Sequence, residues 1–358
     1  MNNQFSIQNS RFPVAPRTAL VAMSGGVDST VAALLALRDG LDCAGAVMKL
    51  HQSDGSDTED AKEAALKLGL PFYMLDFSDT FTEHVISAFI NAYREGRTPN
   101  PCVACNKNVK FGRLLKEARD MGKDILITGH YANIERNGSG RLLLKKGADP
   151  LKDQSYVLYT LKQEQLANIH FPLGGLTKQE VRSIALEAGL ENAKKRESQD
   201  ICFIPDGDYV KFIIEHTGET TRKGRFVDVH GKDLGENRGV VCYTVGQRRG
   251  MGLAMPYPAY VLELRPEEDT VVVGKDEMLY SKTLYAKNIN FIPFDKLATP
   301  IRARVRIRYR HDEQPAVIRQ TDNDTVRVDF DEPQRAITKG QAAVIYDDDV
   351  VIGGGTIM

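Results

Sequence analysis

Two of the five cysteines stand in a C-x-x-C spacing, at Cys102 and Cys105. We expect a helix over residues 106–121, which would begin directly after Cys105 and carry Lys107 and Lys110 in its first turns. Because a helix N-terminus and nearby cations stabilise a thiolate, this position predicts a lowered thiol pKa. Cys105 therefore has the setting of a nucleophile.

A third cysteine, Cys202, lies in the polar stretch KKRESQDICFIPDG, which has neither a clean strand nor a clean helix pattern. Its neighbours Ile201 and Phe203 are apolar, so one interpretation is a buried structural thiol. The other is a reactive thiol on a mobile segment, which the irregular pattern after a basic cluster favours. The sequence leaves both interpretations open.

A glycine-rich turn is the second feature that could do chemistry. Residues 19–22 predict a short buried strand, Ser24-Gly25-Gly26 a loop without bulk, and residues 29–38 a helix. At such a junction the free amide groups and the positive end of the helix dipole can hold an anion. A kinase-type P-loop would need a lysine in the loop, and this loop has none. An ordinary strand-to-helix turn is the simpler alternative.

The elements around these residues alternate between strand and helix. The expected strands cover residues 19–22, 42–50, 71–77 and 124–128, and the expected helices cover 29–38, 59–68, 79–96 and 106–121. This alternation is typical of an α/β fold with a doubly wound parallel sheet, whose ligands bind beyond the carboxyl ends of the strands. The glycine turn, Met48, the loop before Cys105 and Gly129 would share that rim.

The pattern changes after residue 140, where a hairpin around Asn137-Gly138 is followed by two expected helices, residues 154–167 and 178–188. Beyond about residue 220 the chain alternates with period two between turn residues, which predicts β domains. The expected domains are a disordered leader (1–17), an α/β domain (18–206) with a helical insertion (about 141–205), a central β domain (207–280) and a C-terminal β-barrel (281–358).

Composition limits the possible classes of protein. A formal net charge of −1 excludes a uniformly basic nucleic-acid binder, so any RNA surface must be local. No apolar run is long enough to span a membrane, and the N-terminus lacks a signal-peptide pattern. We expect a cytoplasmic protein with no membrane partner. In that reducing compartment, reactive or metal-binding cysteines are favoured over a disulfide framework.

The stretch IRARVRIRYR, residues 301–310, predicts a local basic surface. As a strand it would place five arginines on one face and apolar residues on the other. The simpler interpretation is a solvated strand face, but such faces usually mix charges of both signs. We therefore expect a stripe that binds phosphates.

Ten blocks follow one another in a recognisable order: AMSGGVDS at 22, RTPNP at 97, CNKNVKFG at 105, TGHYA at 128, KDQSYVLYTL at 152, FPLG at 171, ESQDICFI at 197, YTVGQRRG at 243, RYRH at 308, and GQAAVIY with GGGTI near the end. In these blocks the chain resembles the tRNA-specific 2-thiouridylase family (MnmA, also called TrmU) over about residues 18–358. Residues 24–29 resemble the SGGxDS loop of the PP-loop ATP pyrophosphatases. The resemblance implies a PP-loop domain, a central β domain and a C-terminal β-barrel, and the ATP-dependent 2-thiolation of the wobble uridine of tRNA.

The resemblance also implies roles for residues at matching positions. These are ATP binding by Ala22, Met23, Ser24, Gly25, Gly26, Val27, Asp28, Ser29, Met48 and Gly129, target-base binding by Asn100, Pro101 and Cys102, and tRNA binding by His130, Lys152, Asp153, Gln154, Arg308, Tyr309 and Gln341. Cys105 would be the nucleophile and Cys202 the persulfide carrier, joined in a redox disulfide during turnover. Many family members have aspartate where this chain has Cys102, which leaves the role of that position open.

The chemistry that the resemblance implies begins with transfer of AMP from ATP to O2 of uracil, with Mg²⁺ bridging the phosphates. Sulfur from a donor protein would reach C2 through the Cys202 persulfide. Alternatively, Cys102, Cys105 and Cys202 could be three ligands of a 4Fe-4S cluster with one iron open; a zinc site lacks a fourth ligand of the usual kind. Two rivals remain: another PP-loop adenylating enzyme, which would not need Cys105 and Cys202, and a catalytically idle tRNA-binding or metal-binding protein.

Overall fold

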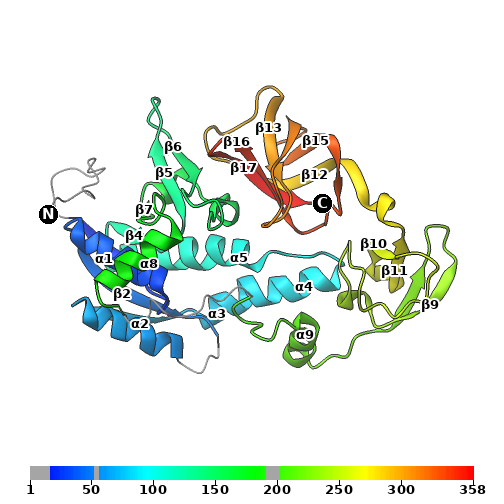
Figure 1. The fold of residues 1–358 in the computed structure, drawn as a ribbon, viewed down its shortest axis with the longest axis horizontal. Helices are drawn as coiled ribbons and strands as arrows, with labels where there is room; N and C mark the ends of the chain where they lie inside the picture. Colours follow the sequence, from blue (N-terminus) through cyan, green and yellow to red (C-terminus); the bar gives the residue numbers. More distant parts are fainter. Residues whose placement is uncertain (1–16, 52–55, 191–200) are drawn as a thin grey trace.

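The computed structural model describes residues 17–51, 56–190 and 201–358 (Figure 1). The expected leader, apart from Arg17, lies outside these residues, and so does the polar run 191–200 before Cys202. In Figure 1 an α/β body lies on the left, a β-barrel at the upper right and a small β-sheet at the right. No helix in the described ranges is long and apolar enough to cross a membrane.

The N-terminal body is built on a sheet of parallel strands in the order β3-β2-β1-β4-β7. The strands are β1 (Thr18–Ala22), β2 (Asp42–Lys49), β3 (Phe72–Asp76), β4 (Ile125–Ile127) and β7 (Ile169–His170). Along β1, Leu20 packs into the core on one face, and Ala19 and Val21 pack into the core on the other. Burial on both faces explains why this strand is apolar throughout rather than alternating. The predicted doubly wound parallel sheet is confirmed.

Helices cover both faces of this sheet. One face carries α1 (Val27–Arg38), α2 (Ser56–Lys67) and α8 (Lys178–Glu187). The other carries two continuous helical runs, first α3 (Ser78–Phe81), η1 (Thr82–Ser87) and α4 (Ala88–Arg94), then α5 (Pro101–Ala104), η2 (Cys105–Leu114) and α6 (Leu115–Asp120). In η1 and η2 the helix is π-type, a rare geometry that often marks functional positions.

The helix expected over residues 154–167 is wrong. The chain forms a 3-10 helix, η3 (Ser155–Leu158), and a short helix, α7 (Gln163–Leu166). All four residues of η3 are buried, so the segment has no solvent-facing side. Its Tyr156 hydroxyl donates a hydrogen bond to the carbonyl of Ala342 in the barrel, at 2.8 Å. Tertiary packing on the barrel therefore overrides the local helical pattern.

The second half is β structure, as predicted. Helix α9 (Tyr209–Thr217) leads into a sheet with the order β10-β11-β8-β9, formed by β8 (Gly224–Val227), β9 (Asp233–Asn237), β10 (Tyr260–Arg265) and β11 (Thr270–Gly274). The barrel follows with β12 (Tyr280–Phe291), β13 (Ile301–Arg306), β14 (Gln314–Gln320), β15 (Thr325–Arg335), β16 (Ala342–Asp347) and β17 (Val350–Ile357). Pairing of β12 with β17 closes it, which confirms the predicted C-terminal barrel.

Several contacts join the barrel to the α/β body, and two of them position a hairpin and the loop before α5. The hairpin of β5 (Ala132–Arg136) and β6 (Leu142–Lys146) extends the barrel sheet, because β6 pairs with β17 where Lys145 meets Val350. The second contact holds the loop before α5, where the Thr98 amide donates to the carbonyl of Lys339 at 2.8 Å. We call this loop before α5, residues 97–100, the proline-rich loop, and its position depends on the barrel.

Candidate active site

The glycine turn between β1 and α1 is held by hydrogen bonds within itself. The Ser24 amide donates to Oγ of Ser29 at 3.1 Å, and this hydroxyl donates to the carbonyl of Gly26 at 3.0 Å. Gly25 has a φ of 73°, a left-handed conformation that favours glycine. Gly26 is the N-cap of α1, so no capping side chain covers the first turn of the helix. The turn has the form of an anion site at a helix N-terminus.

Gly129 is fixed by its approach to this turn. A Cβ at Gly129 would lie 2.8 Å from the carbonyl carbon of Asp28 and 2.9 Å from the amide nitrogen of Ser29. Only glycine therefore lets the chain after β4 cross the start of α1. Ala22, Met48 and Gly129 lie at or just beyond the carboxyl ends of β1, β2 and β4, so the sheet brings the predicted ATP residues to one rim.

Sequence reasoning missed two partners of this turn. Lys178 Nζ lies 2.7 Å from Oδ1 and 2.8 Å from Oδ2 of Asp28, and the Tyr131 hydroxyl donates to Oδ1 at 2.7 Å. Lys178 is the first residue of α8, far from Asp28 in the sequence. No local pattern in the sequence signals this ion pair.

The cysteine helix begins earlier than predicted. Pro101 is its first residue and Asn100 is its N-cap, with Oδ1 accepting from the Cys102 amide at 3.1 Å and from the Val103 amide at 3.3 Å. Cys102 and Cys105 therefore lie inside the first turns of the helical run rather than in the loop before it. Proline suits the first position of a helix, because its missing amide hydrogen is not needed there for a helical hydrogen bond.

The predicted lowering of the Cys105 pKa is wrong for this arrangement. Burial of the thiol, which is 9% exposed, raises its pKa to about 11, and the charge of Lys110 opposes this shift. Desolvation also raises the pKa of Cys102 and Cys202, again opposed by Lys110. The charges of Cys102 and Cys202 raise the pKa of Cys105, and the charge of Cys102 raises the pKa of Cys202, which places the three thiols near one another in space. All three cysteines are free thiols.

Cys202 reaches solvent, so the interpretation of a buried structural thiol is wrong. The next residue, Phe203, anchors this segment by packing edge-on against Phe81 and Phe89, with ring centroids 5.6 and 5.5 Å apart. The Phe203 ring therefore fixes this turn to the core, while the Cys202 thiol next to it remains accessible to solvent. Within the ranges that the structure describes, no group of three or more His, Cys, Asp or Glu side chains is arranged to hold a metal ion.

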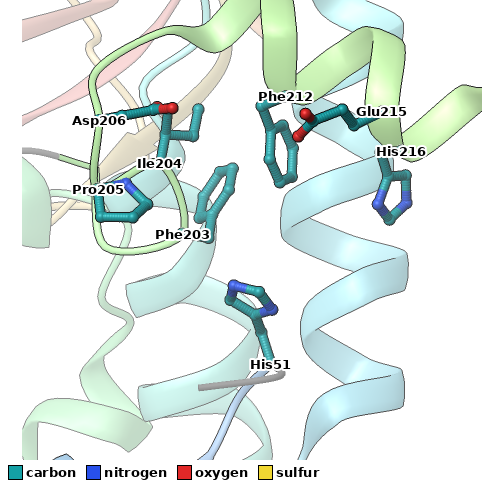
Figure 2. Close-up of a pocket in the computed structure, with 8 residues that line it drawn as sticks. All are labelled: His51, Phe203, Ile204, Pro205, Asp206, Phe212, Glu215 and His216. Atoms are coloured by element: carbon teal, nitrogen blue, oxygen red, sulfur yellow. The ribbon is translucent and has the colours of Figure 1, made fainter. Parts of the chain in front are cut away.

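A hollow of about 510 Å³ opens on the same turn (Figure 2). Figure 2 shows Phe203 and Phe212 facing each other at its centre, with His51 on one side and His216 of α9 on another. Neither the glycine turn nor Cys105 lines it. The hollow borders the rim on which the predicted ATP residues lie, because His51 follows the end of β2, but it does not include the glycine turn.

The predicted tRNA residues fall into two groups. The His130 ring is 6% exposed, lies between Phe111 and Phe171, and pairs through Nδ1 with the Thr128 hydroxyl at 2.7 Å. Burial holds its pKa well below the usual range. Asp153 is also buried, where it accepts hydrogen bonds from Ser155. These side chains hold the fold together, and this geometry does not offer them to RNA.

The other predicted tRNA-binding residues lie nearer the surface. Tyr309 is 40% exposed and donates from its hydroxyl to the carbonyl of Asp153 at 3.3 Å, while Arg308 beside it is partly exposed. Lys152 and Gln154 are partly exposed too, and Gln154 Oε1 accepts from the Tyr131 amide at 3.0 Å. Gln341 Nε2 donates to the carbonyl of Thr98 at 2.9 Å, so Gln341 holds the loop that carries Asn100 and Pro101.

The predicted stripe of five arginines is wrong. Strand β13 ends at Arg306, so the later arginines leave the shared face. Arg304 and Arg306 pair with Glu313, at 3.8 and 3.0 Å. Arg302 pairs with Asp331. Glu313, just before β14, and Asp331, on β15, thus neutralise the half of the stripe that does form.

The fold and the glycine turn together define a nucleotide-binding α/β domain. The family described as "tRNA methyl transferase HUP domain" matches residues 17–206. The "tRNA methyl transferase PRC-barrel domain" matches residues 210–275, and the "Aminomethyltransferase beta-barrel domain" matches residues 281–357.

The chain is also similar to curated proteins over nearly its whole length. The tRNA-specific 2-thiouridylase MnmA of Clostridioides difficile is 46% identical over 353 residues, which cover 95% of this chain and 98% of that protein. The protein of the same name from Acetivibrio thermocellus is 46% identical over 358 residues, which cover 96% and 100%. This chain belongs to the tRNA-specific 2-thiouridylase family.

Proposed function

We propose that this protein is a tRNA-uridine 2-sulfurtransferase, which uses ATP to convert the wobble uridine of tRNA to 2-thiouridine. One observation carries the proposal: Cys202, far from Cys105 in the sequence, lies close enough to raise the pKa of the Cys105 thiol, beside the Asn100 loop. The names of the relatives support tRNA thiolation. The matching family descriptions mention methyl transfer, a reaction that would not explain a paired thiol site.

The first half of the reaction activates the base. The C2 carbonyl of uracil has no leaving group, so AMP is transferred from ATP to its O2 and pyrophosphate departs. The turn of residues 22–29 would hold the phosphates through its amides, and Met48 and Gly129 would contact the nucleotide at the same rim. Magnesium would enter with ATP and offset the charge of the phosphates.

The second half moves sulfur. A donor protein gives Cys202 a persulfide, and the Cys105 thiolate attacks the inner sulfur of that persulfide. The Cys105–Cys202 disulfide forms and hydrosulfide leaves; hydrosulfide then attacks C2, and AMP carries away the C2 oxygen. A thiol reductant must reduce the disulfide before the next turnover. Because burial raises the pKa of Cys105 to about 11, this thiol is mostly protonated near neutral pH, and we propose that substrate binding lowers its pKa.

The loop of Asn100, Pro101 and Cys102 would receive the uracil after it leaves the base stack. Gln341 steadies this loop from the barrel, and Arg308 and Tyr309 lie on the exposed side of the barrel, where tRNA would reach them. We keep His130, Lys152, Asp153 and Gln154 as part of the tRNA-binding region. For the buried His130 and Asp153 we propose that they shape this region rather than touch RNA.

A cluster mechanism has less support, because the described cysteines are not arranged as a metal-binding group. We therefore derive no step through an iron–sulfur cluster. The persulfide route needs only the thiols that the chain provides.

Nucleoside mass spectrometry tests the proposal. Unmodified tRNA with a wobble uridine is incubated with the protein, ATP, magnesium, a persulfide donor and a thiol reductant under anaerobic conditions. We expect 2-thiouridine only when ATP is present, and a loss of at least a thousandfold in Cys105→Ser and Cys202→Ser, as for removal of a nucleophile. Thiolation by both serine variants would contradict the relay, and a wild type that forms neither AMP nor 2-thiouridine would contradict the proposed function.

A further inference from the structure

A partly buried ion pair at the start of α1 plays no part in the reaction as described above. Lys178 is 7% exposed, and its ammonium group contacts both oxygens of the Asp28 carboxylate. The Tyr131 ring lies 5.9 Å from this ammonium group, and its hydroxyl donates to the same carboxylate. Burying an ammonium group carries a large desolvation penalty even when the group is paired. A lysine at this position therefore calls for a reason beyond packing.

The glycine turn brings the wrong charge for a phosphate ligand. Among residues 22–29, the Asp28 carboxylate is the one ionisable side chain. It repels the phosphates of ATP, and the helix N-terminus supplies only about half a positive charge. Lys178 changes this balance from 150 residues away in the sequence. Its ammonium group gives the site the positive charge that the turn lacks.

The fold holds Lys178 at this point by fixing the start of α8. The Thr177 side chain caps the helix, accepting from the Glu180 amide at 3.3 Å, and the Glu180 carboxylate accepts from the Thr177 amide at 2.7 Å. The Lys178 amide itself donates to Oδ2 of Asp149 at 2.9 Å. Val181 and Ala185 of α8 lie in the same core as α1. The ammonium group is thus delivered to the turn by a rigid element.

We propose that Lys178 binds the β- and γ-phosphates of ATP, and then the departing pyrophosphate, at the turn of residues 22–29. This inference rests on the proposed use of ATP. Asp28 and Tyr131 orient the ammonium group, and the more highly charged phosphate oxygens take over hydrogen bonds from the Asp28 carboxylate. Lys178 thereby does the work that a P-loop lysine does from within its own loop.

The test compares ligands with and without the outer phosphates. Calorimetry measures the affinities of the full chain for ATP, pyrophosphate and AMP. Lys178→Met should weaken ATP and pyrophosphate binding about tenfold to a hundredfold, the range for a lost hydrogen bond to a charged group, and leave AMP binding unchanged. Lys178→Arg should keep part of the preference for ATP over AMP, because the charge remains.

Thr177→Ala is the matched control, because it weakens the start of α8 and leaves the ammonium group in place. It should keep the ratio of ATP to AMP affinity. If Lys178→Met leaves the ratio of ATP affinity to AMP affinity as it is in the wild type, Lys178 only joins α8 to α1 and the inference is overturned. If the wild type itself binds ATP no better than AMP, the proposed function falls first and the inference falls with it.

Discussion

The glycine turn and the cysteine site differ in how complete they are. The turn is closed by its own hydrogen bonds, crossed by Gly129 and joined to Lys178. The cysteine site draws its thiols from two separate segments, and burial raises the pKa of Cys105 to about 11. One site is arranged for its ligand by the chain alone. The other holds the proposed nucleophile in a buried setting that raises its pKa and so opposes the reactive thiolate.

The physical chemistry of the two sites explains this difference. Binding an anion needs backbone amides and fixed charges, which a folded chain supplies at once. Forming a thiolate needs stabilisation of a new negative charge, which a buried setting opposes. We infer that the nucleotide half is ready before tRNA and sulfur arrive, and that the sulfur half is completed by them. Substitutions that affect one half and spare the other test this separation.

The largest effect is expected from Gly129→Val. Its Cβ would lie 2.8 Å from the Asp28 carbonyl carbon, so the start of α1 must shift. ATP affinity should fall more than tenfold, and the free energy of unfolding should drop by about 1–3 kcal/mol, as for overpacking. Calorimetry and chemical denaturation measure the two. Gly175→Ala is the control, since a Cβ at Gly175 meets nothing within 4 Å. Unchanged ATP affinity in Gly129→Val would show that the turn does not bind the nucleotide.

A smaller effect is expected at the cysteine site from Lys110→Met. The thiolate is the form that reacts with iodoacetamide, and its fraction rises with pH up to the pKa. Alkylation of wild-type Cys105 should therefore speed up about tenfold per pH unit from pH 7 to 10, without a plateau. Lys110→Met should slow it several-fold, and the exposed Lys107→Met should not. Peptide mass spectrometry reads each thiol separately. A plateau near pH 8 in the protein alone would mean that the nucleophile is already activated, and the contrast between the two sites would disappear.

The smallest effect is expected from Asn100→Ala, which removes the cap of the cysteine helix. Loss of a side-chain cap costs about 1 kcal/mol of stability. Thiolation should slow a few-fold because Cys102 and Cys105 lie in the first turns, and ATP affinity should not change. Asn91→Ala, at an exposed position of α4, is the control and should alter neither. A loss of ATP affinity in Asn100→Ala would link the two sites more tightly than the structure indicates.

The sequence predicted β1 and α1 correctly because their pattern is local: an apolar strand, a glycine turn and a helix within about twenty residues. It could not predict Lys178, whose role depends on how α8 packs against α1. The start of the cysteine helix was missed because Pro101 has two opposite interpretations, as a breaker within a helix and as a good first residue. Asn100 as a cap was the signal that could have decided between them.

The other errors come from burial, which a single sequence does not display. Cys105 has a helix N-terminus and Lys110 in its favour, yet desolvation outweighs them in its pKa. The arginines of β13 alternate as predicted, but Glu313, just before β14, and Asp331, on β15, neutralise them. His130 belongs to a recognisable sequence block and still lies inside the core. The sequence pattern identified these residues as notable, but the contacts of each side chain depend on packing between distant parts of the chain.

The contacts between the proline-rich loop and the barrel also set an order in time. Thr98 receives its hydrogen bond from Gln341, which is 243 residues later in the sequence. At a synthesis rate of roughly 5–20 residues per second, the ribosome needs about 12–50 s to reach that partner. Gly129 and Lys178 are made within this interval, so the α/β body can complete its glycine turn before Gln341 is available to support the loop. A nascent chain would therefore acquire the proposed nucleotide site before the proposed target-base loop is held in place.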